Sequence, residues 1–295
     1  ACEIIKLPCG AILFDAGVVA RGGFRIGKKM AEIGTAGLVT INLVSTIMDE
    51  KTWPSVEIST DFPLEACFLA QSANWLIEKE GFKAMGSGPA CLLNPRLKIG
   101  QDFGYKEEAS NAVLVLEGRQ MPNDAIASGL AAECNLKGRS LRMIIAPTSS
   151  LAGSVQIAAR SIETALHKMH HLGLDITKVK NGIGSCPIAP PTGDDFTALG
   201  RTNDAMMFGS RVWLTVDGVS DAELAEWAKK IPASCSPGYG DPFLEMLKKA
   251  GDFYRIDPGL FAPAEITLTS LSSGFVAHAG GQDIPRLKKT VFGEG

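Results

Sequence analysis

The sequence predicts an α/β or α+β protein with layered packing. Two short, nearly continuous apolar runs, 112–116 (AVLVL) and 141–145 (LRMII), are typical of strands that are buried on both faces. Segments with helical spacing fall between such runs, and this alternation indicates layers of sheet and helix. Hydrophobic residues make up 45% and charged residues 21% of the 295 residues. That composition is globular and fits one large domain or two ordinary ones.

Further strands are expected from apolar or loosely alternating segments. They are, in chain order, 11–15, 38–43, 56–60, 212–216, 264–271 and 275–278. Ser272, Ser273 and Gly274 separate the last two segments and predict a hairpin turn.

Helices are expected at 64–79, 124–134, 224–231 and 242–250. Asp61 and Pro63 precede the first of these and suit its cap and first turn. Ser220 and Glu223 fit a capping box, and Gly251 follows the last helix where a C-terminal glycine is common.

The best-marked helix is expected over 147–168, directly after the LRMII strand. Thr148, Ser149 and Ser150 could supply capping oxygens at its start. Its buried stripe consists of Val155, Ala158, Ala159, Ile162, Leu166 and Met169. A second, polar stripe consists of Gly153, Gln156, Arg160, Glu163 and His167.

Two interpretations of the polar stripe stay open on the pattern alone. Arg160 and Glu163 could form an exposed pair worth a few tenths of a kcal/mol. Alternatively the stripe is functional, because Gly153 leaves room at the helix start, where free N–H groups could meet a carbonyl or an anion.

The loop-rich stretch 86–104 is the candidate link between two lobes. The sequence therefore predicts a first α/β lobe at 1–104 and a second at 105–295, which carries the best-marked strand and helix.

Charge and composition exclude several partners. The net charge is −3 without a basic block, so nucleic acid has no support. No apolar run reaches the roughly 18 residues of a membrane helix, and no signal peptide is expected. The seven cysteines are widely spaced without a C-x-x-C pair, which indicates reduced thiols and a cytoplasmic location.

Two further clusters could contact a ligand. Gly86, Ser87 and Gly88 form a compact turn whose glycines permit close backbone approach, although an ordinary loop explains them equally well. A second group of hydrogen-bonding residues follows a Pro-rich loop and is expected to lie in a loop, although turn and cap roles explain it equally well; it contains Arg201, Thr202, Asn203 and Asp204.

Several chemistries lack their motifs. There is no P-loop, no dinucleotide fingerprint and no nucleophile elbow. His167 and His171 are four residues apart, but the pattern supplies no further ligands, so no metal and no cofactor is expected.

Several segments together resemble the methenyltetrahydromethanopterin cyclohydrolase family. They occur in the family's order and are 86–90 (GSGPA), 146–156 (APTSSLAGSVQ), 160–168 (RSIETALHK), 200–204 (GRTND), 252–254 (DFY) and 261–265 (FAPAE). The resemblance implies a two-lobed α/β enzyme with a cleft between the lobes, assembled as a homotrimer. It implies reversible hydration of the methenyl bridge of a tetrahydromethanopterin-type coenzyme to the N5-formyl form in one-carbon metabolism, as in methanogenesis and methylotrophy.

The family's central-helix arginine and glutamate match Arg160 and Glu163, which are therefore expected to be catalytic. A carboxylate can serve as general base for water, so no metal is required. The expected substrate-binding residues are Gln71, Gly86, Ser87, Gly88, Thr148, Gln156, Arg201, Thr202, Asn203 and Asp204.

Two departures from the family keep alternatives open. Cys91 stands where the family usually has arginine, with Arg96 five residues on, and Asp241 stands where lysine is common. Fewer positive groups would weaken the hold on an acidic coenzyme tail. The alternatives are a binding paralogue without turnover, a cyclohydrolase for a folate or another modified pterin, and a structural or interaction protein without a cleft. We also expect the family's upstream segment to be missing from this sequence.

Overall fold

The computed structural model describes residues 2–72, 75–251 and 255–293, and its chain divides into two compact units. Unit 1 comprises Ala1–Leu38 and Glu65–Gln156, and unit 2 comprises Val39–Leu64 and Ile157–Gly295. This division departs from the predicted boundary at residue 104, because the strands of each sheet are not consecutive in the chain. Residues 105–156 belong to unit 1, and residues 39–64 belong to unit 2. The cleft expected between the lobes stays a prediction.

Unit 1 is built on a mixed sheet of six strands among the described residues, in the order β1-β2-β8-β7-β6-β5. The strands are β1 (Glu3–Lys6), β2 (Ile12–Asp15), β5 (Trp75–Lys79), β6 (Phe82–Ser87), β7 (Ala112–Glu117) and β8 (Leu141–Ala146). β2, β8 and β7 run parallel at the centre, and the outer pairs are antiparallel. The two AVLVL and LRMII strands are thus confirmed.

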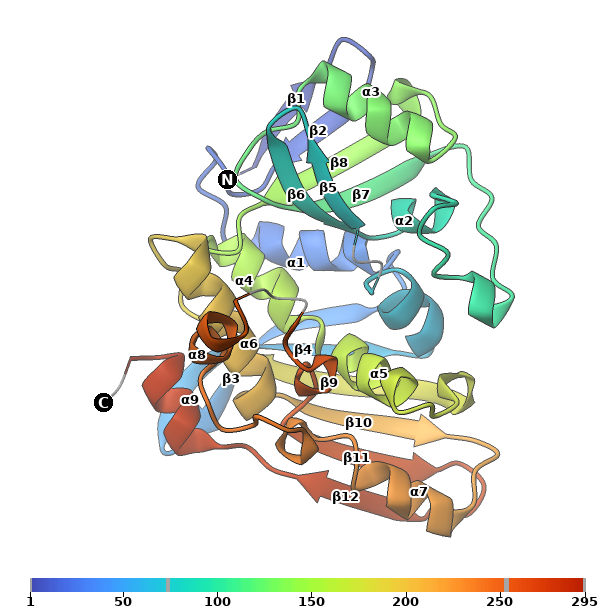
Figure 1. Ribbon diagram of the computed structural model, residues 1–295, viewed down its shortest axis with the longest axis vertical. Helices are drawn as coiled ribbons and strands as arrows, with labels where there is room; N and C mark the ends of the chain where they lie inside the picture. The colour runs from blue at the N-terminus through green and yellow to red at the C-terminus, as the bar shows by residue number, and fades with distance from the viewer. Residues whose placement is uncertain (1, 73–74, 252–254, 294–295) are drawn as a thin grey trace. The chain divides into compact units, whose positions relative to one another are not determined.

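Helices cover both faces of this sheet (Figure 1). They are α1 (Phe24–Gly34), α2 (Ala90–Leu93), α3 (Asp124–Glu133) and α4 (Leu151–Ala158), with 3-10 turns at Gln101–Phe103 and Gly138–Ser140. Leu130 of α3 packs with Leu114 and Met143 on one face. Met30 of α1 and Ala152 of α4 pack on the other. β7 and β8 are almost entirely apolar because both of their faces are buried.

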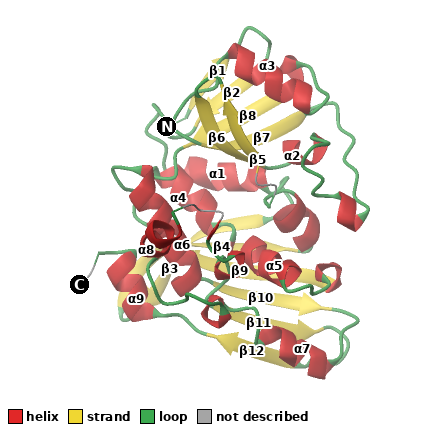
Figure 2. Cartoon of the chain, in the orientation of Figure 1, coloured by secondary structure: helices red, strands yellow, loops and turns green. Residues whose placement is uncertain are grey.

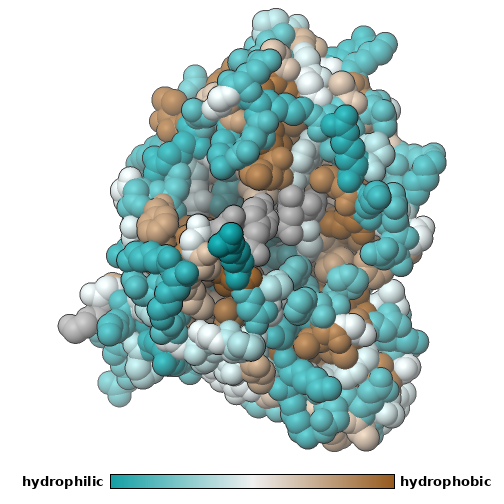
Figure 3. Space-filling model, viewed as in Figure 1, coloured by the Kyte–Doolittle hydropathy of each residue, from teal (hydrophilic) through white to brown (hydrophobic). Residues whose placement is uncertain are grey.

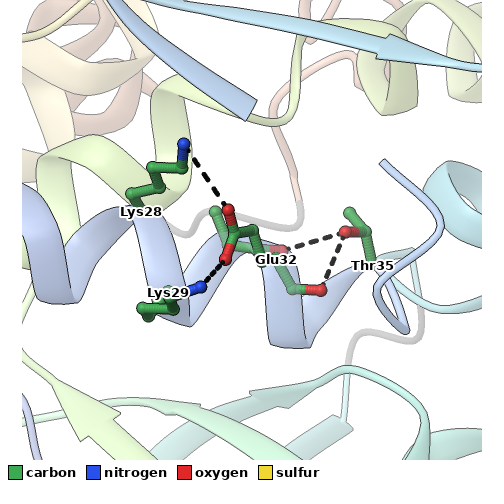
Figure 4. Close-up of polar contacts among 5 residues, drawn as sticks. Lys28, Lys29, Glu32 and Thr35 are labelled. Carbon is green, nitrogen blue, oxygen red and sulfur yellow. Dashed lines mark hydrogen bonds and ion pairs between the residues drawn. The ribbon is translucent and has the colours of Figure 1, made fainter. Parts of the chain in front are cut away.

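Ion pairs on the surface of α1 and hydrogen bonds at its C-terminal end stabilise this helix (Figure 4). Lys29 Nζ lies 2.7 Å from Glu32 Oε2, and Lys28 Nζ lies 3.7 Å from Glu32 Oε1. Thr35 follows the last helical residue, and its hydroxyl donates to the carbonyl oxygens of Ala31 and Glu32, both at 3.1 Å. These bonds satisfy carbonyls that the helix end leaves open.

Unit 2 contains the second mixed sheet of six described strands, in the order β12-β11-β10-β9-β4-β3. They are β3 (Thr40–Met48), β4 (Lys51–Thr60), β9 (Val179–Pro187), β10 (Arg211–Val216), β11 (Glu265–Ser270) and β12 (Val276–Gly280). β10 and β11 are parallel, and the other pairs are antiparallel. The predicted hairpin turn at 272–274 is confirmed, with Gly274 at φ 73°.

The helices of unit 2 are α5 (Ser161–His171), α6 (Asp195–Gly209), α7 (Asp221–Ala228), α8 (Phe243–Ala250) and α9 (Ile284–Thr290), with 3-10 turns at Ile176–Lys178, Ala233–Cys235 and Pro258–Leu260. α5 and α6 pack on β9, and α7 packs on β11 and β12 (Figure 2). Ser220 caps α7 by accepting from the Glu223 N–H at 3.3 Å, and Gly251 ends α8 at φ 73°. The predicted cap at Ser220 and the predicted helix end at Gly251 are confirmed.

The predicted helix at 64–79 is wrong. A π-helix occupies Pro63–Leu69, and β5 begins at Trp75. Glu80 and Gly81, both at positive φ, turn the chain into β6, which makes a hairpin of this segment. Trp75 and Ile77 are buried and Leu76 is exposed, so the burial has the two-residue period of a strand.

Polar and apolar side chains are interspersed over the face of the molecule drawn in Figure 3. Within the described ranges, no helix is both long and apolar enough to cross a membrane.

Candidate active site

Three loops of unit 1 begin at the carboxyl ends of its parallel strands. β2 ends at Asp15, β7 ends at Glu117, and β8 is followed by Pro147 and the start of α4. In open α/β sheets this edge is where ligands bind, because the loops there converge. This edge of unit 1 is therefore a candidate ligand-binding edge.

Glu117 joins two of the predicted ligand residues. Its Oε1 accepts a short hydrogen bond from the Thr148 hydroxyl, and its Oε2 accepts from Gln156 Nε2 at 3.2 Å. Thr148 is 6% exposed and Gln156 is 4% exposed. The structure thus brings Thr148 and Gln156 together through a carboxylate that the sequence did not single out. The available signal was an acidic residue that directly ends an apolar strand.

The predicted capping at the start of α4 is confirmed for Ser150, whose hydroxyl oxygen accepts from the Gly153 N–H at 3.0 Å. Ser149 instead accepts from Arg119 Nη2 at 2.8 Å. A Cβ on Gly153 would lie 2.2 Å from the Pro147 carbonyl oxygen, so this glycine allows the loop to fold against the helix.

The helix predicted over 147–168 is two helices, and this corrects the prediction of one continuous helix. α4 ends at Ala158, and α5 begins at Ser161, with Arg160 at its N-cap position. The apolar stripe of Val155 and Ile162 continues on both pieces, so the sequence pattern does not reveal the break.

Arg160 and Glu163 meet at the start of α5 in unit 2. Arg160 Nε lies 3.3 Å from Glu163 Oε2, and the two side chains are 19% and 11% exposed. A carboxylate in the first turn of a helix is favoured by the helix dipole. The exposed-pair interpretation is therefore wrong, because both charged groups are largely buried.

Glycines of β9 allow α5 to pack closely against the sheet. A Cβ on Gly184 would lie 2.3 Å from Ser161 Oγ, and a Cβ on Gly182 would lie 2.9 Å from Ile162 Cδ1. Helix and strand approach this closely only because both positions lack side chains. The position of Glu163, two residues after Ser161, thus depends on the composition of β9.

The Gly-Ser-Gly turn lies at the end of β6. Gly88 has φ 94°, which favours glycine, and its N–H donates to the Ala70 carbonyl oxygen at 2.7 Å. This bond brings the turn next to Gln71, which is 3% exposed. A Cβ on Gly86 would lie 3.1 Å from Ile77 Cδ1, so core packing already explains that glycine. Ser87 is also buried.

The 200–204 cluster lies within α6 and not in a loop, because Asp194 caps a helix that begins at Asp195. The Thr202 hydroxyl donates to the Ala198 carbonyl at 2.9 Å, and Asn203 Nδ2 donates to the Leu199 carbonyl at 2.8 Å. Arg201 is half-buried.

Asp204 is 3% exposed and accepts from the Phe243 N–H at 2.8 Å, which ties α6 to the start of α8. Burial raises the pKa of Asp204 to about 6, although the hydrogen bond from Phe243 acts to lower it. Thr202 and Asp204 thus make structural contacts, and the ligand roles of the four residues stay predictions.

Comparison with known proteins decides the family. The model of the family described as Cyclohydrolase (MCH) matches residues 1–291. A relative from Methylobacillus flagellatus is 41% identical over 290 residues, which are 98% of this chain and 88% of the relative. One from Methanococcoides burtonii is 40% identical over 269 residues, 90% of this chain and 84% of the relative. Both are named methenyltetrahydromethanopterin cyclohydrolase.

The chain belongs to the cyclohydrolase (MCH) family. The departures from the family pattern can now be placed in this cyclohydrolase-family protein. Cys91 is fully buried in the core of unit 1, whereas Arg96 is exposed. Asp241 Oδ2 lies 2.6 Å from Lys249 Nζ at the surface. The family-like segment 252–254 lies outside the described residues.

Metal ligands do not gather in the part of the chain that the structure describes. No group of three or more His, Cys, Asp or Glu side chains there could hold a metal ion. His167 is half-buried and His171 is exposed on α5.

Proposed function

We propose that this protein hydrates the methenyl bridge of N5,N10-methenyl-tetrahydromethanopterin to the N5-formyl form, reversibly, in one-carbon metabolism. The observation that carries the proposal is the buried Arg160–Glu163 pair at the start of α5. Its support is the name methenyltetrahydromethanopterin cyclohydrolase that relatives 40–41% identical bear.

Glu163 is the proposed general base. The methenyl bridge is a cationic amidinium, so its carbon is already electrophilic. As water oxygen bonds to that carbon, Glu163 takes a water proton and a neutral carbinol forms. The proton then passes to N10 as the carbon–N10 bond breaks, the hydroxyl proton leaves, and the formyl carbonyl forms. Each hydration releases one proton, and general-base catalysis of this kind contributes about 10²–10⁴-fold in rate.

Arg160 is the proposed partner that orients this base. Its Nε lies 3.3 Å from Glu163 Oε2, and a planar guanidinium restricts the carboxylate more than an ammonium would. In addition to this pair, the proposed substrate-binding residues are those predicted from the sequence, among which Thr148 and Gln156 lie at the strand edge of unit 1.

We also propose that the protein is a cytoplasmic homotrimer. The proposed reaction uses no metal and no prosthetic group. Light scattering at micromolar concentration is expected to give three times the chain mass, and a monomer mass would contradict the trimer. Activity is expected to survive a chelator, and stoichiometric zinc or iron by elemental analysis would contradict the cofactor-free reaction.

The deciding experiment follows the methenyl absorbance over time with methanopterin and folate substrates side by side. Faster hydration of the methanopterin compound supports the proposal. The surface ion pair of Asp241, where the family commonly has lysine, favours one second candidate, a cyclohydrolase for a pterin with a different tail. Faster hydration of the folate compound would select that candidate, and binding without turnover would indicate a paralogue that only binds pterins.

A further inference from the structure

Glu117 fixes the direction of two hydrogen bonds at the strand edge of unit 1. An ionised carboxylate only accepts hydrogen bonds. Thr148 must therefore donate its hydroxyl proton to Oε1, and Gln156 must turn its NH₂ group to Oε2, at 3.2 Å. The network thereby sets which end of the Gln156 amide faces away from Glu117.

Two acceptor oxygens result from this arrangement. Thr148 Oγ1 keeps its lone pairs, and Gln156 Oε1 is turned away from the carboxylate. Both side chains are more than nine-tenths buried, and no described residue donates a hydrogen bond to either oxygen. Neither oxygen is a fully buried atom without a partner, so each remains able to accept a hydrogen bond from a bound molecule.

We propose that Glu117 is a specificity-determining residue. By orienting Thr148 and Gln156, it makes this end of the sheet bind the side of a ligand that carries N–H donors. This inference rests on the proposed function, and in a reduced pterin the groups of that kind are the 2-amino group and the adjacent ring N–H of the 2-aminopyrimidin-4-one. A pterin with a carbonyl in place of the 2-amino group would bring its carbonyl oxygen against the acceptor oxygens of Thr148 and Gln156. Such a pterin is expected to bind more weakly. Glu117 acts through Thr148 and Gln156 and takes no part in proton transfer at the bridge.

A purely structural role makes a different prediction. If Glu117 only ties β7 to the segment before and within α4, its removal lowers stability and weakens every ligand equally. The ratio of affinities for an amino and an oxo pterin separates the two roles, because polarity at the edge changes that ratio and loosened packing does not.

The test measures binding of tetrahydropterin and of tetrahydrolumazine, its 2-oxo counterpart, to the whole protein by calorimetry. The wild type is expected to prefer tetrahydropterin by about 10-fold or more. In Glu117→Gln the carboxamide can donate as well as accept, so the polarity is no longer fixed and the preference falls to within about 3-fold. Thr148→Val, which removes one donor–acceptor at nearly constant shape, is expected to lower the preference as well.

Glu78→Gln is the matched control, since Glu78 lies in β5 of the same sheet and pairs with Lys83 at the surface. It is expected to keep the wild-type ratio. An unchanged ratio in folded Glu117→Gln or Thr148→Val, equal binding of both compounds by wild type, or binding of neither would overturn the inference. Wild-type hydration of the methenyl substrate is measured separately. Its absence refutes the proposed function, while the binding ratio still decides the role of Glu117.

Discussion

Asp15 in unit 1 and Asp204 in unit 2 are both almost fully buried, yet their pKa values move in opposite directions. Burial acts to raise the pKa of Asp15, but four backbone N–H groups at 2.7–2.9 Å outweigh it and lower the value. At Asp204 burial dominates over the bond from Phe243 and raises the pKa to about 6. The number of backbone donors therefore decides whether a buried carboxylate is a fixed anion or a group that titrates near neutrality.

Glu163 extends this comparison to the proposed chemistry. Its carboxylate pairs with the Arg160 guanidinium and is the proposed proton acceptor in each turnover. The predictions below test these three carboxylates and the packing that positions the last.

Glu163→Gln has the largest expected effect. The amide keeps the shape and helix propensity but cannot take a proton, so hydration is expected to slow by about 10²–10⁴-fold with a much smaller change in affinity. The methenyl absorbance followed over time gives the rate, and thermal melts control for folding. Arg160→Lys is expected to be slower too, because lysine lacks the planar fork. A folded Glu163→Gln protein at near wild-type rate would move the base elsewhere.

Asp15→Asn is expected to lower the free energy of unfolding by about 2–4 kcal/mol at neutral pH. One carboxamide oxygen replaces two charged acceptors, which leaves part of the four N–H groups of residues 17–20 unsatisfied. The folded-state pKa of Asp15 is lowered, so its contribution is present above the unfolded pKa and is lost as pH falls through the folded one.

Urea unfolding at several pH values measures this effect. Asp175→Asn is the control, because Asp175 is exposed and accepts from the Thr177 N–H at 3.1 Å. It is expected to cost less than about 1 kcal/mol, as exposed caps do. If both substitutions lower the unfolding free energy equally, the four N–H groups around Asp15 stabilise the fold no more than an exposed cap does.

Gly184→Ala tests whether β9 positions Glu163. The new Cβ would lie 2.3 Å from Ser161 Oγ, so α5 must shift, at a cost of about 2–3 kcal/mol in unfolding free energy and a slower hydration rate. Adding Ser161→Gly is expected to restore part of both. Gly193→Ala, with no atom within 4 Å of its Cβ, is the control and is expected to change neither. Full activity in Gly184→Ala would refute the dependence.

Asp204→Asn has the smallest expected effect, and it depends on pH. The folded-state pKa of about 6 lies above the unfolded value of 3.8, so the folded protein binds more protons and wild-type stability falls as pH rises between them. Relative to Asp204→Asn, the wild type is expected to lose about 2 kcal/mol between pH 4 and 7. Parallel stability curves for the two proteins would contradict the raised pKa.

The sequence predicted strands best where burial leaves an unbroken apolar run. β7 and β8 satisfy this condition, because helices cover both faces of their sheet. β9 was missed because Gly182, Gly184 and Ser185 interrupt its pattern. Those glycines serve the close approach of α5, and a tertiary contact of that kind leaves no local signal.

The pairing of Arg160 with Glu163 was predictable from their spacing, and their catalytic role was expected only from the family resemblance. Arg160 and Glu163 are three apart, and the helix break before Ser161 leaves them together. Glu117 was not predictable, because its partners follow it by more than thirty residues and meet it only through the pairing of β7 with β8. Asp204 looked like a loop ligand, since a polar run does not show that a helix will bury it.

The pairing of β4 with β9 has a consequence for synthesis on the ribosome. The β3–β4 hairpin leaves the ribosome early, but its partner strand Val179–Pro187 emerges only after all of unit 1. At about 5–20 residues per second this delay lasts on the order of ten seconds. During that time β4 presents an unpaired edge in the nascent chain, where a chaperone would find an extended, partly apolar segment to hold.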